Sequence, residues 1–304
     1  MELSVKQSTN LFQYRHSWFH LFRPLTFTGT IAPATAGAIL AFSYGSFNFI
    51  WFIVFLIAIL LVQAAINMLN DYYDFKRGQD FDKWVQPFES GISHGPCHAS
   101  LPKVAGGMLL AASLIGLWLG MMTTPWIILI GIAGITAGWL YSGGPRPLSS
   151  IALGEAIAFL FMGPAPLFVS LLIQGHLIRL EALLISLPFA LMISTMIMTN
   201  NIRDIKKDRG HRVTIPILLG KNNAVKLLSL LLAIGYVSMI GIVWKGLLPW
   251  TVIFSLLALP LAAKLIHSFR SSASRSEELA AMKVAAIHHW TFSIIFLIGY
   301  VGGL

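Results

Sequence analysis

The chain has 304 residues, of which 56% are hydrophobic and only 11% are charged. Soluble domains carry about 25% charged residues, so this composition and a mean hydropathy of +0.76 exclude an ordinary soluble protein and indicate a polytopic membrane protein. The formal net charge is +9. Membrane topology explains most of this excess, so the charge gives no independent support to a nucleic-acid partner.

Nine apolar runs are long enough to cross a lipid bilayer as helices, which takes about 17 to 25 residues each. The polar segment 1–22 precedes them and lacks the charged start, apolar core and small-residue cleavage site of a signal peptide. We therefore expect an all-α membrane protein with nine transmembrane helices in a single domain, 1–304. In chain order the runs are 24–43, 48–69, 104–122, 125–142, 153–173, 182–200, 225–244, 248–267 and 286–303.

Basic residues indicate how these helices are oriented, because Lys and Arg are retained on the cytoplasmic side of a membrane. Nineteen of the 21 Lys and Arg residues fall on one side of the predicted bundle, and only Arg179 and Lys245 fall on the other. We therefore expect a multi-pass protein of the cell membrane with segment 1–22 in the cytoplasm. Cys97 is the only cysteine, so no disulfide within the chain is possible.

Acidic residues are rare and concentrated in two places, each at the end of an apolar run on the basic side. The first cluster is 67–74, with Asn67 and Asn70, and the second is 200–208, with Asn200 and Asn201. Carboxylates beside hydrocarbon are costly unless a metal, a cationic partner or a water-filled cavity compensates. Half of the 12 acidic residues lie in or just after these clusters: Asp71, Asp74, Asp80, Asp82, Asp204 and Asp208.

Helical spacing aligns the polar side chains within each cluster. If each cluster continues the helix before it, steps of three or four residues place side chains on one face. Mg²⁺ binds in proteins through a few carboxylates together with substrate phosphates. The pattern therefore predicts a Mg²⁺ site whose remaining ligand is a diphosphate. Its expected ligands are Asn67, Asp71, Asp74, Asn200, Asp204 and Asp208.

Basic residues interleave with the acids and could neutralise diphosphate oxygens that the metal leaves uncovered. A single cluster of acids and bases at a helix end is equally explained as a solvated interfacial loop. Two clusters with the same stepped pattern, about 133 positions apart from Asn67 to Asn200, make that explanation weaker. The interleaved basic residues are Lys76, Arg77, Arg203, Lys206, Lys207 and Arg212.

Four stretches of the sequence form a recognisable set. They are the first cluster extended to Asp80, residues 141–148 (Tyr-Ser-Gly-Gly-Pro-Arg-Pro-Leu), Leu153-Gly-Glu155 with Gly163-Pro164, and the second cluster extended to Gly210 with Thr214 and Leu219-Gly220. With Arg23-Pro24-Leu25-Thr26, this set resembles the UbiA superfamily of intramembrane prenyltransferases over nearly the whole chain. Within it, the sequence is most similar to the 1,4-dihydroxy-2-naphthoate prenyltransferases of menaquinone biosynthesis.

The resemblance implies a nine-helix bundle in which a polyprenyl diphosphate places its head on two Mg²⁺ ions and its tail in a hydrophobic tunnel. Cap loops at 78–100 and 209–222 would shield an allylic carbocation from water until an electron-rich aromatic ring attacks it. With 1,4-dihydroxy-2-naphthoate as the acceptor, the prenyl group replaces the carboxylate, and demethylmenaquinone and CO₂ are formed.

The resemblance also implies roles for individual residues. Asp71, Asp74, Asp204 and Asp208 are the expected catalytic groups, and Asp80 substitutes for an aspartate that the superfamily often carries where this chain has Gly78. Tyr141 and Arg146 fall where the family has substrate contacts, although both equally fit an interfacial anchor and a cytoplasmic charge. The residues expected on substrate are Asn67, Asn70, Lys76, Arg77, Tyr141, Arg146, Asn200, Asn201, Arg203 and Lys207.

Alternatives remain at this stage. The acceptor could be another ring, such as hydroxybenzoate, homogentisate or haem. A secondary transporter could also have repeated halves and intramembrane carboxylates, although transporters usually carry these near the bilayer midplane. His94, Cys97 and His98 could ligate zinc, but no fourth ligand suggests itself.

Overall fold

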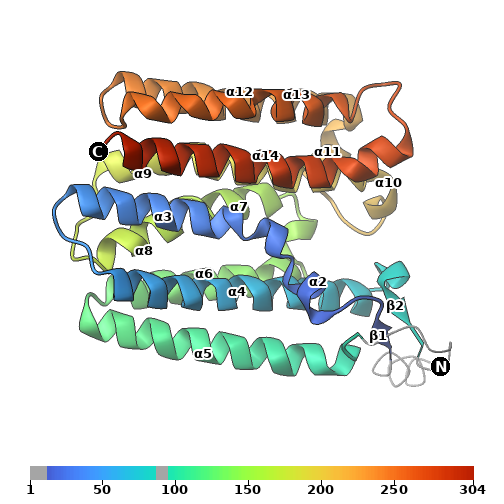
Figure 1. Ribbon diagram of the computed structural model, residues 1–304. Coiled ribbons are helices and arrows are strands. Elements are labelled where there is room, and N and C mark those ends of the chain that lie inside the picture. The colour runs from blue at the N-terminus through green and yellow to red at the C-terminus, as the bar shows by residue number, and fades with distance from the viewer. Residues whose placement is uncertain (1–11, 87–94) are drawn as a thin grey trace.

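Uninterrupted runs of apolar residues fold as helices in lipid, because each backbone polar group must be hydrogen-bonded within its own segment. The computed structural model describes residues 12–86 and 95–304, and in these ranges it is a bundle of helices with roughly parallel long axes (Figure 1). The α-helices are α2 (Trp18–Phe22), α3 (Thr28–Ser43), α4 (Phe49–Lys76), α5 (Leu101–Met122), α6 (Trp126–Ser142), α7 (Gly154–Phe161), α8 (Pro164–Leu172), α9 (Leu180–Arg203), α10 (Ile205–Asp208), α11 (Ile215–Leu219), α12 (Lys221–Trp244), α13 (Leu259–His267) and α14 (Arg275–Gly302).

Short elements complete the fold. The strands β1 (Gln13–Tyr14) and β2 (Trp84–Val85) pair antiparallel beside the end of α4, with Tyr14 opposite Trp84. The 3₁₀ helices are η1 (Pro24–Thr26), η2 (Phe81–Lys83), η3 (His98–Ser100), η4 (Leu148–Ser150) and η5 (Trp250–Ala258).

The predicted all-α membrane class is confirmed. Seven helical segments in the described ranges are long and apolar enough to span a bilayer, and the pair Trp18–Thr26 and Thr28–Ser43, bent by 50°, would make an eighth. Helix α6 is apolar but has only 17 residues. The count of nine spans therefore stays a prediction. The seven segments are Phe49–Lys76, His98–Met122, Gly154–Leu172, Leu180–Arg203, Lys221–Trp244, Trp250–His267 and Arg275–Gly302.

Two boundaries differ from the sequence-based expectation in ways that affect the site. Helix α14 begins at Arg275, about three turns before the predicted 286, because Ser274 and Glu277 form a capping box that starts the helix among charged residues. The second cluster does not continue its helix as expected. Helix α9 ends at Arg203, and Asp204, with φ −100° and ψ 8°, separates it from α10. The first cluster does continue α4, to Lys76.

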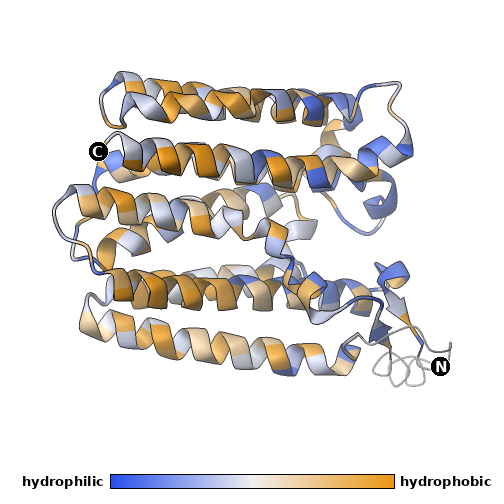
Figure 2. Cartoon of the chain, viewed as in Figure 1, coloured by the Kyte–Doolittle hydropathy of each residue, from blue (hydrophilic) through white to orange (hydrophobic). Residues whose placement is uncertain are grey.

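Polar residues gather at one end of the bundle, where α2, β2 and α10 lie (Figure 2). The C-terminus lies at the opposite end (Figure 1). Both Asn/Asp clusters are at the polar end, because α4 finishes there and α10 follows α9 there. This distribution places the candidate site where the hydrophobic core gives way to polar loops.

Helices α3 and α8 approach closely at a glycine. A Cβ atom on Gly37 would lie 2.5 Å from the carbonyl oxygen of Leu167 and 2.9 Å from Cβ of Ser170. The backbone of Leu167 cannot move aside as a flexible side chain could, so only glycine permits this packing.

We predict that Gly37→Ala lowers the free energy of unfolding by about 1 to 3 kcal/mol, the usual cost of overpacking a core. Thermal unfolding of the purified protein in detergent measures this. The matched control is Gly241→Ala in α12, where a Cβ meets nothing within 4 Å and alanine favours the helix. Equal melting temperatures for the two variants would contradict the prediction.

Candidate active site

A cavity of about 910 Å³ runs through the bundle from the polar end toward its apolar middle. Helix α4 contributes one continuous wall to it, with side chains spaced by three or four residues from Phe55 to Asp74. This wall changes character along its length. Phe55, Ile59 and Val62 line the apolar part, and Asn67, Asn70 and Asp74 line the polar part.

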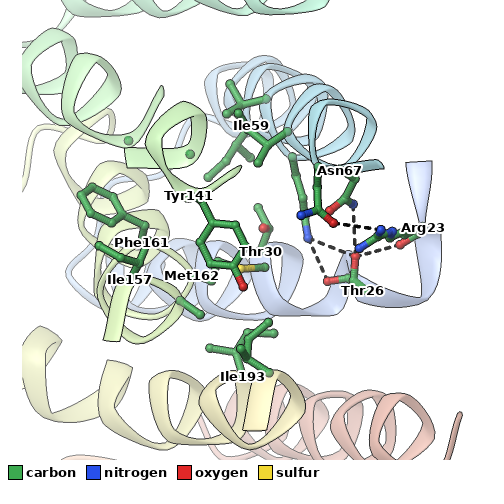
Figure 3. Close-up of a pocket in the computed structure, with 18 of the residues that line it drawn as sticks. Arg23, Thr26, Thr30, Ile59, Asn67, Tyr141, Ile157, Phe161, Met162 and Ile193 are labelled. Atoms are coloured by element: carbon green, nitrogen blue, oxygen red, sulfur yellow. Dashed lines mark hydrogen bonds between the residues drawn. The ribbon is translucent and has the colours of Figure 1, made fainter. Parts of the chain in front are cut away.

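Apolar side chains from other helices close the inner part of the cavity. Figure 3 shows Ile157, Phe161, Met162 and Ile193 gathered on the side opposite α4. The predicted substrate contact Tyr141 also lines the cavity, and its ring points into it. An elongated apolar ligand with a polar head would match this lining.

The first cluster is held in place by residues from two other segments. Asp71 is fully buried, and its Oδ1 accepts hydrogen bonds from Nη2 of Arg23 at 2.8 Å and from Nζ of Lys83 at 2.7 Å. Arg23 also donates to Oδ1 of Asn70 at 3.0 Å. Oδ2 of Asp71 is buried without a hydrogen-bond partner among the described residues. Within residues 12–86 and 95–304, this carboxylate therefore keeps one oxygen without a hydrogen-bond donor.

The two amides of the first cluster are oriented by hydrogen bonds of their own. Asn67 donates from Nδ2 to the carbonyl oxygen of Phe22 at 2.8 Å, and Asn70 donates from Nδ2 to Oγ of Ser142 at 2.8 Å. Figure 3 shows Asn67 beside Arg23 and Thr26. These contacts fix both amides at the wall of the cavity.

The second cluster lies across the same cavity. Arg203 donates to both oxygens of Asp204, at 2.8 and 2.5 Å, and to Oδ1 of Asn200 at 2.8 Å. Asn201 donates to Oε1 of Glu155 at 2.9 Å, so the acid at the start of α7 supports this cluster. The whole second set lines the cavity: Asn200, Asn201, Arg203, Asp204, Lys207 and Asp208.

Salt bridges join the two clusters. Arg212 lies 2.8 Å from Oδ1 of Asp74 and 3.8 Å from Oδ1 of Asp208. Asp80 pairs with Lys83 at 2.6 Å and also with Lys207. The ends of α4 and of α10 are therefore connected through alternating charges although they are more than 100 positions apart in the sequence.

The loop residues of this network have shifted pKa values. Burial disfavours the charged form of Asp80, but Lys83 and Lys207 outweigh burial and hold its pKa below the ordinary value. Burial raises the pKa of Asp208, and the positive charge of Arg212 only partly offsets this. Burial alone would lower the pKa of Arg212, but Asp74 and Asp208 raise it above the ordinary value. Asp80 and Arg212 are therefore charged at neutral pH.

Three predicted substrate residues lie outside the lining of the cavity. Nζ of Lys76 is 5.7 Å from the ring centroid of Tyr72, and the guanidinium of Arg77 is 5.5 Å from that of Tyr73. Arg77 also donates to the carbonyl oxygen of Gly144 at 3.1 Å. Arg146 is exposed. Lys76 and Arg77 therefore lie beside the first cluster at the outer edge of the cavity, and Arg146 lies on the surface.

Sequence reasoning missed three residues of the cavity wall as site residues. Arg23 enters the sequence analysis only through the family resemblance and Lys83 only through the count of basic residues, yet both bind Asp71. Gln63 lines the cavity one helical turn before Asn67 and donates to the carbonyl oxygen of Thr26 at 2.9 Å. Gln63 is a polar residue within an apolar run, four positions before Asn67, and this spacing could have identified it as a site residue.

No group of three or more His, Cys, Asp or Glu in residues 12–86 and 95–304 is arranged to hold a metal ion. In the two Asn/Asp clusters, Arg and Lys side chains lie between the carboxylates and keep them from converging on one point. His94 of the considered zinc set lies outside the described residues, and the ring of His98 stacks on Tyr72 at 4.4 Å. The donor set that lines the cavity still suits a hard cation, since it consists of carboxylate and amide oxygens. The predicted ligand Asp71 does not itself line the cavity, and its Oδ2 is buried behind the wall.

The sequence matches the UbiA prenyltransferase family over residues 30–292. The chain belongs to this family. One relative is the 1,4-dihydroxy-2-naphthoate octaprenyltransferase of Bacillus subtilis, which is 33% identical over 92% of this chain and 91% of the relative. Another is the protein of the same name from Mycobacterium tuberculosis, 29% identical over 88% of this chain and 90% of the relative.

Solved structures of the family share this fold. A UbiA homologue from Aeropyrum pernix K1 superposes with a TM-score of 0.67 at 15% identity, covering 91% of this chain and 98% of that one. A UbiA homologue from Archaeoglobus fulgidus bound to GPP and Mg²⁺ has a TM-score of 0.60 at 15% identity, covering 92% and 99%. At these identities the likeness shows the fold alone.

We predict that Arg212→Ala lowers the rate of prenyl transfer by about tenfold to a hundredfold, because removing one partner of a buried ion pair leaves Asp74 uncompensated. Steady-state assays with the donor varied measure this effect. The matched control is Arg209→Ala in the same loop, whose exposed side chain does not line the cavity. Similar losses in both variants would mean that the loop, and not the Arg212 charge, matters.

Proposed function

We propose that this protein transfers a polyprenyl group from polyprenyl diphosphate to 1,4-dihydroxy-2-naphthoate, with release of diphosphate and CO₂. One observation carries the proposal. Two Asn/Asp clusters from distant parts of the chain line the polar end of one cavity, and the same cavity continues as an apolar channel along α4. A head of high negative charge and a long apolar tail are the two parts of the proposed donor.

The diphosphate would lie between the first and second clusters. The basic residues that line this part of the cavity would contact its phosphate oxygens: Arg23, Lys83, Arg203, Lys207 and Arg212. Arginine matches phosphate geometry particularly well, because its planar fork donates two parallel hydrogen bonds. Lys76 and Arg77 remain candidates for contacts at the outer edge.

The carboxylates and amides of the two clusters would hold Mg²⁺, and bound Mg²⁺ would stabilise the charge that develops on the departing diphosphate. This role is supported by the donor set and by the related structure with GPP and Mg²⁺. The proposed ligands, directly or through water, are Asn67, Asn70, Asp71, Asp74, Asn200, Asn201, Asp204 and Asp208.

The bond changes of the proposed reaction balance as follows. The C–O bond between the prenyl group and the diphosphate breaks, and the diphosphate leaves with the electron pair. The ring carbon that bears the carboxylate attacks the prenyl cation and forms a C–C bond. The bond to the carboxylate then breaks, its electrons restore the aromatic ring, and CO₂ leaves.

The side chains around the channel would shield this cation from water. Ile59 and Phe161 are apolar parts of the lining, and Tyr141 extends into the space between these two side chains (Figure 3). An electron-rich ring such as tyrosine can stabilise a nearby cation through its π face. We assign Tyr141 to this position beside the reacting carbon, and Arg146 to the cytoplasmic surface.

The choice of acceptor rests on the relatives, two of which carry the name 1,4-dihydroxy-2-naphthoate octaprenyltransferase. Hydroxybenzoate, homogentisate and haem are the other acceptors to compare. Ion-coupled transport is the weaker alternative, since the acids lie at helix ends beside loops and not at the middle of broken spans.

We further propose a single nine-span domain over 1–304 in the cell membrane, with α6 as the short ninth span. The polar end of the bundle would face the cytoplasm, in accord with its excess of Lys and Arg. Segments 78–100 and 209–222 would cap the site there. Residues 87–94 of the first cap lie outside the described ranges.

We expect the purified protein with Mg²⁺, radiolabelled polyprenyl diphosphate and 1,4-dihydroxy-2-naphthoate to form a prenylated naphthoquinol and CO₂. Chelation of the metal with EDTA should abolish product, and added Mg²⁺ should restore it. A panel containing hydroxybenzoate and homogentisate tests the acceptor. If another ring is prenylated, the proposed mechanism stands and the proposed acceptor is wrong. If no ring gives a metal-dependent product, the proposed reaction is refuted.

Asp204→Ala should reduce prenyl transfer by at least about a hundredfold, since removing one charged group from a site that stabilises a transition state costs about 3 kcal/mol or more. Membrane insertion and the melting temperature should be little changed, because Asp204 lies at a break between helices. The control is Asp82→Ala, whose side chain is 78% exposed. Full turnover by the purified Asp204→Ala protein would show that Asp204 is not part of the active site.

A further inference from the structure

Six cationic side chains line the cavity in the described part of the chain, and one of them differs from the others. Arg23 and Lys83 pair with Asp71, Arg203 pairs with Asp204, Lys207 pairs with Asp80, and Arg212 pairs with Asp74. The sixth is Lys283 on α14. It has no ion pair or side-chain hydrogen bond among residues 12–86 and 95–304.

Lys283 is also in an unusual place for an unpaired charge. Hydropathy alone would leave it in a cytoplasmic loop, but α14 begins at Arg275, so Lys283 lies more than two turns inside a helix that could span the membrane. Met282 and Ala286 of the same helix line the cavity with it. Its side chain is exposed, and an ionisable residue within such a segment usually marks a functional site.

The acids nearest along α14 are already paired. Glu277 lies 2.6 Å from Arg270, and Glu278 lies 2.5 Å from Lys221 and 3.0 Å from Arg275. These contacts hold both carboxylates near the start of the helix. Lys283 is therefore the cation of the cavity that can accept an anionic group of a ligand without first releasing a carboxylate of the protein.

We propose that Lys283 binds the ring carboxylate of the aromatic acceptor and thereby selects acceptors that carry one. The inference rests on the proposed function and adds the acceptor subsite to it. The donor diphosphate is assigned to the paired cations between the two clusters. Helix α14 packs on α3 and on α9, which carries the first residues of the second cluster, whereas the first cluster lies on α4. Lys283 therefore reaches the cavity from a helix that carries neither cluster, and a second substrate can approach there.

The chemistry of the reaction gives this contact a further property. The acceptor binds as a carboxylate anion, and the same carbon atom leaves as neutral CO₂ when its bond to the ring breaks. The prenylated product has no carboxylate. Lys283 therefore binds the substrate through a charge-assisted hydrogen bond that the product cannot make, and the enzyme does not retain its product at this subsite.

The experiment compares Lys283→Met with Lys283→Arg in detergent, with 1,4-dihydroxy-2-naphthoate or 1,4-naphthohydroquinone as the acceptor. The second compound lacks the carboxylate. Lys283→Met should raise KM for the carboxylated acceptor about tenfold, the loss expected for one charge-assisted hydrogen bond. KM for the polyprenyl diphosphate and the rate with naphthohydroquinone should stay unchanged, and Lys283→Arg should retain most of the acceptor affinity.

The control variant is Lys264→Met on α13, which removes a lysine that is exposed like Lys283 but does not line the cavity. It should leave both KM values unchanged. If Lys283→Met raises KM for the diphosphate instead, Lys283 belongs to the donor site and the inference is overturned. An effect of equal size with and without the acceptor carboxylate, or no effect with either acceptor, would also overturn it.

A binding measurement separates this inference from the proposed function. The probe is 1-hydroxy-2-naphthoate, a fluorescent carboxylate titrated onto the wild-type, Lys283→Met and Lys264→Met proteins without donor. About tenfold weaker binding to Lys283→Met alone supports the subsite even if wild-type protein fails to prenylate dihydroxynaphthoate, which would refute only the reaction. Equal binding to all three proteins, or no binding to the wild type, would refute the subsite.

Discussion

Neutralisation of buried carboxylates is the constraint on which the polar end of this structure depends. Asp71 and Asp74 end a helix that emerges from a hydrophobic bundle, where an uncompensated charge would cost several kcal/mol. Arg23, Lys83 and Arg212 compensate them from three different segments. Each ion pair therefore also fixes a connection, so the turn before α3, the loop after α4 and the loop after α10 are held against one helix end.

Helix α4 combines two functions in a single element. Its cavity-facing side chains change from apolar to amide to carboxylate over about five turns, so the helix orders the chemistry of the whole cavity. The helix period alone produces this order, because every third or fourth residue returns to the same face. A ligand with an apolar tail and a charged head can lie along α4 in one direction only.

The first cluster was predictable because it continues an uninterrupted helix. The expected face of Asn67, Asp71 and Asp74 differs from the cavity lining, which has Asn67, Asn70 and Asp74 and leaves Asp71 behind it. The second cluster was predictable in its residues but not in its backbone, since nothing in the spacing signalled the break at Asp204. The contacts of Arg23 and Lys83 with Asp71 depend on tertiary folding. The start of α14 was missed because its first turns are charged and have low hydropathy, although a capping box stabilises them. For the same reason, the sequence did not predict that Lys283 lies in a helix.

The position of Arg212 between Asp74 and Asp208 implies that metal and diphosphate bind cooperatively in the proposed site. A divalent ion alone would have to displace the guanidinium and leave it without a partner. A diphosphate alone would attract the guanidinium and leave the carboxylates facing each other. When both ligands bind, the metal would take the carboxylates of Asp74 and Asp208, and the diphosphate would take the guanidinium of Arg212. Linkage then requires that each ligand raise the affinity for the other by the same factor.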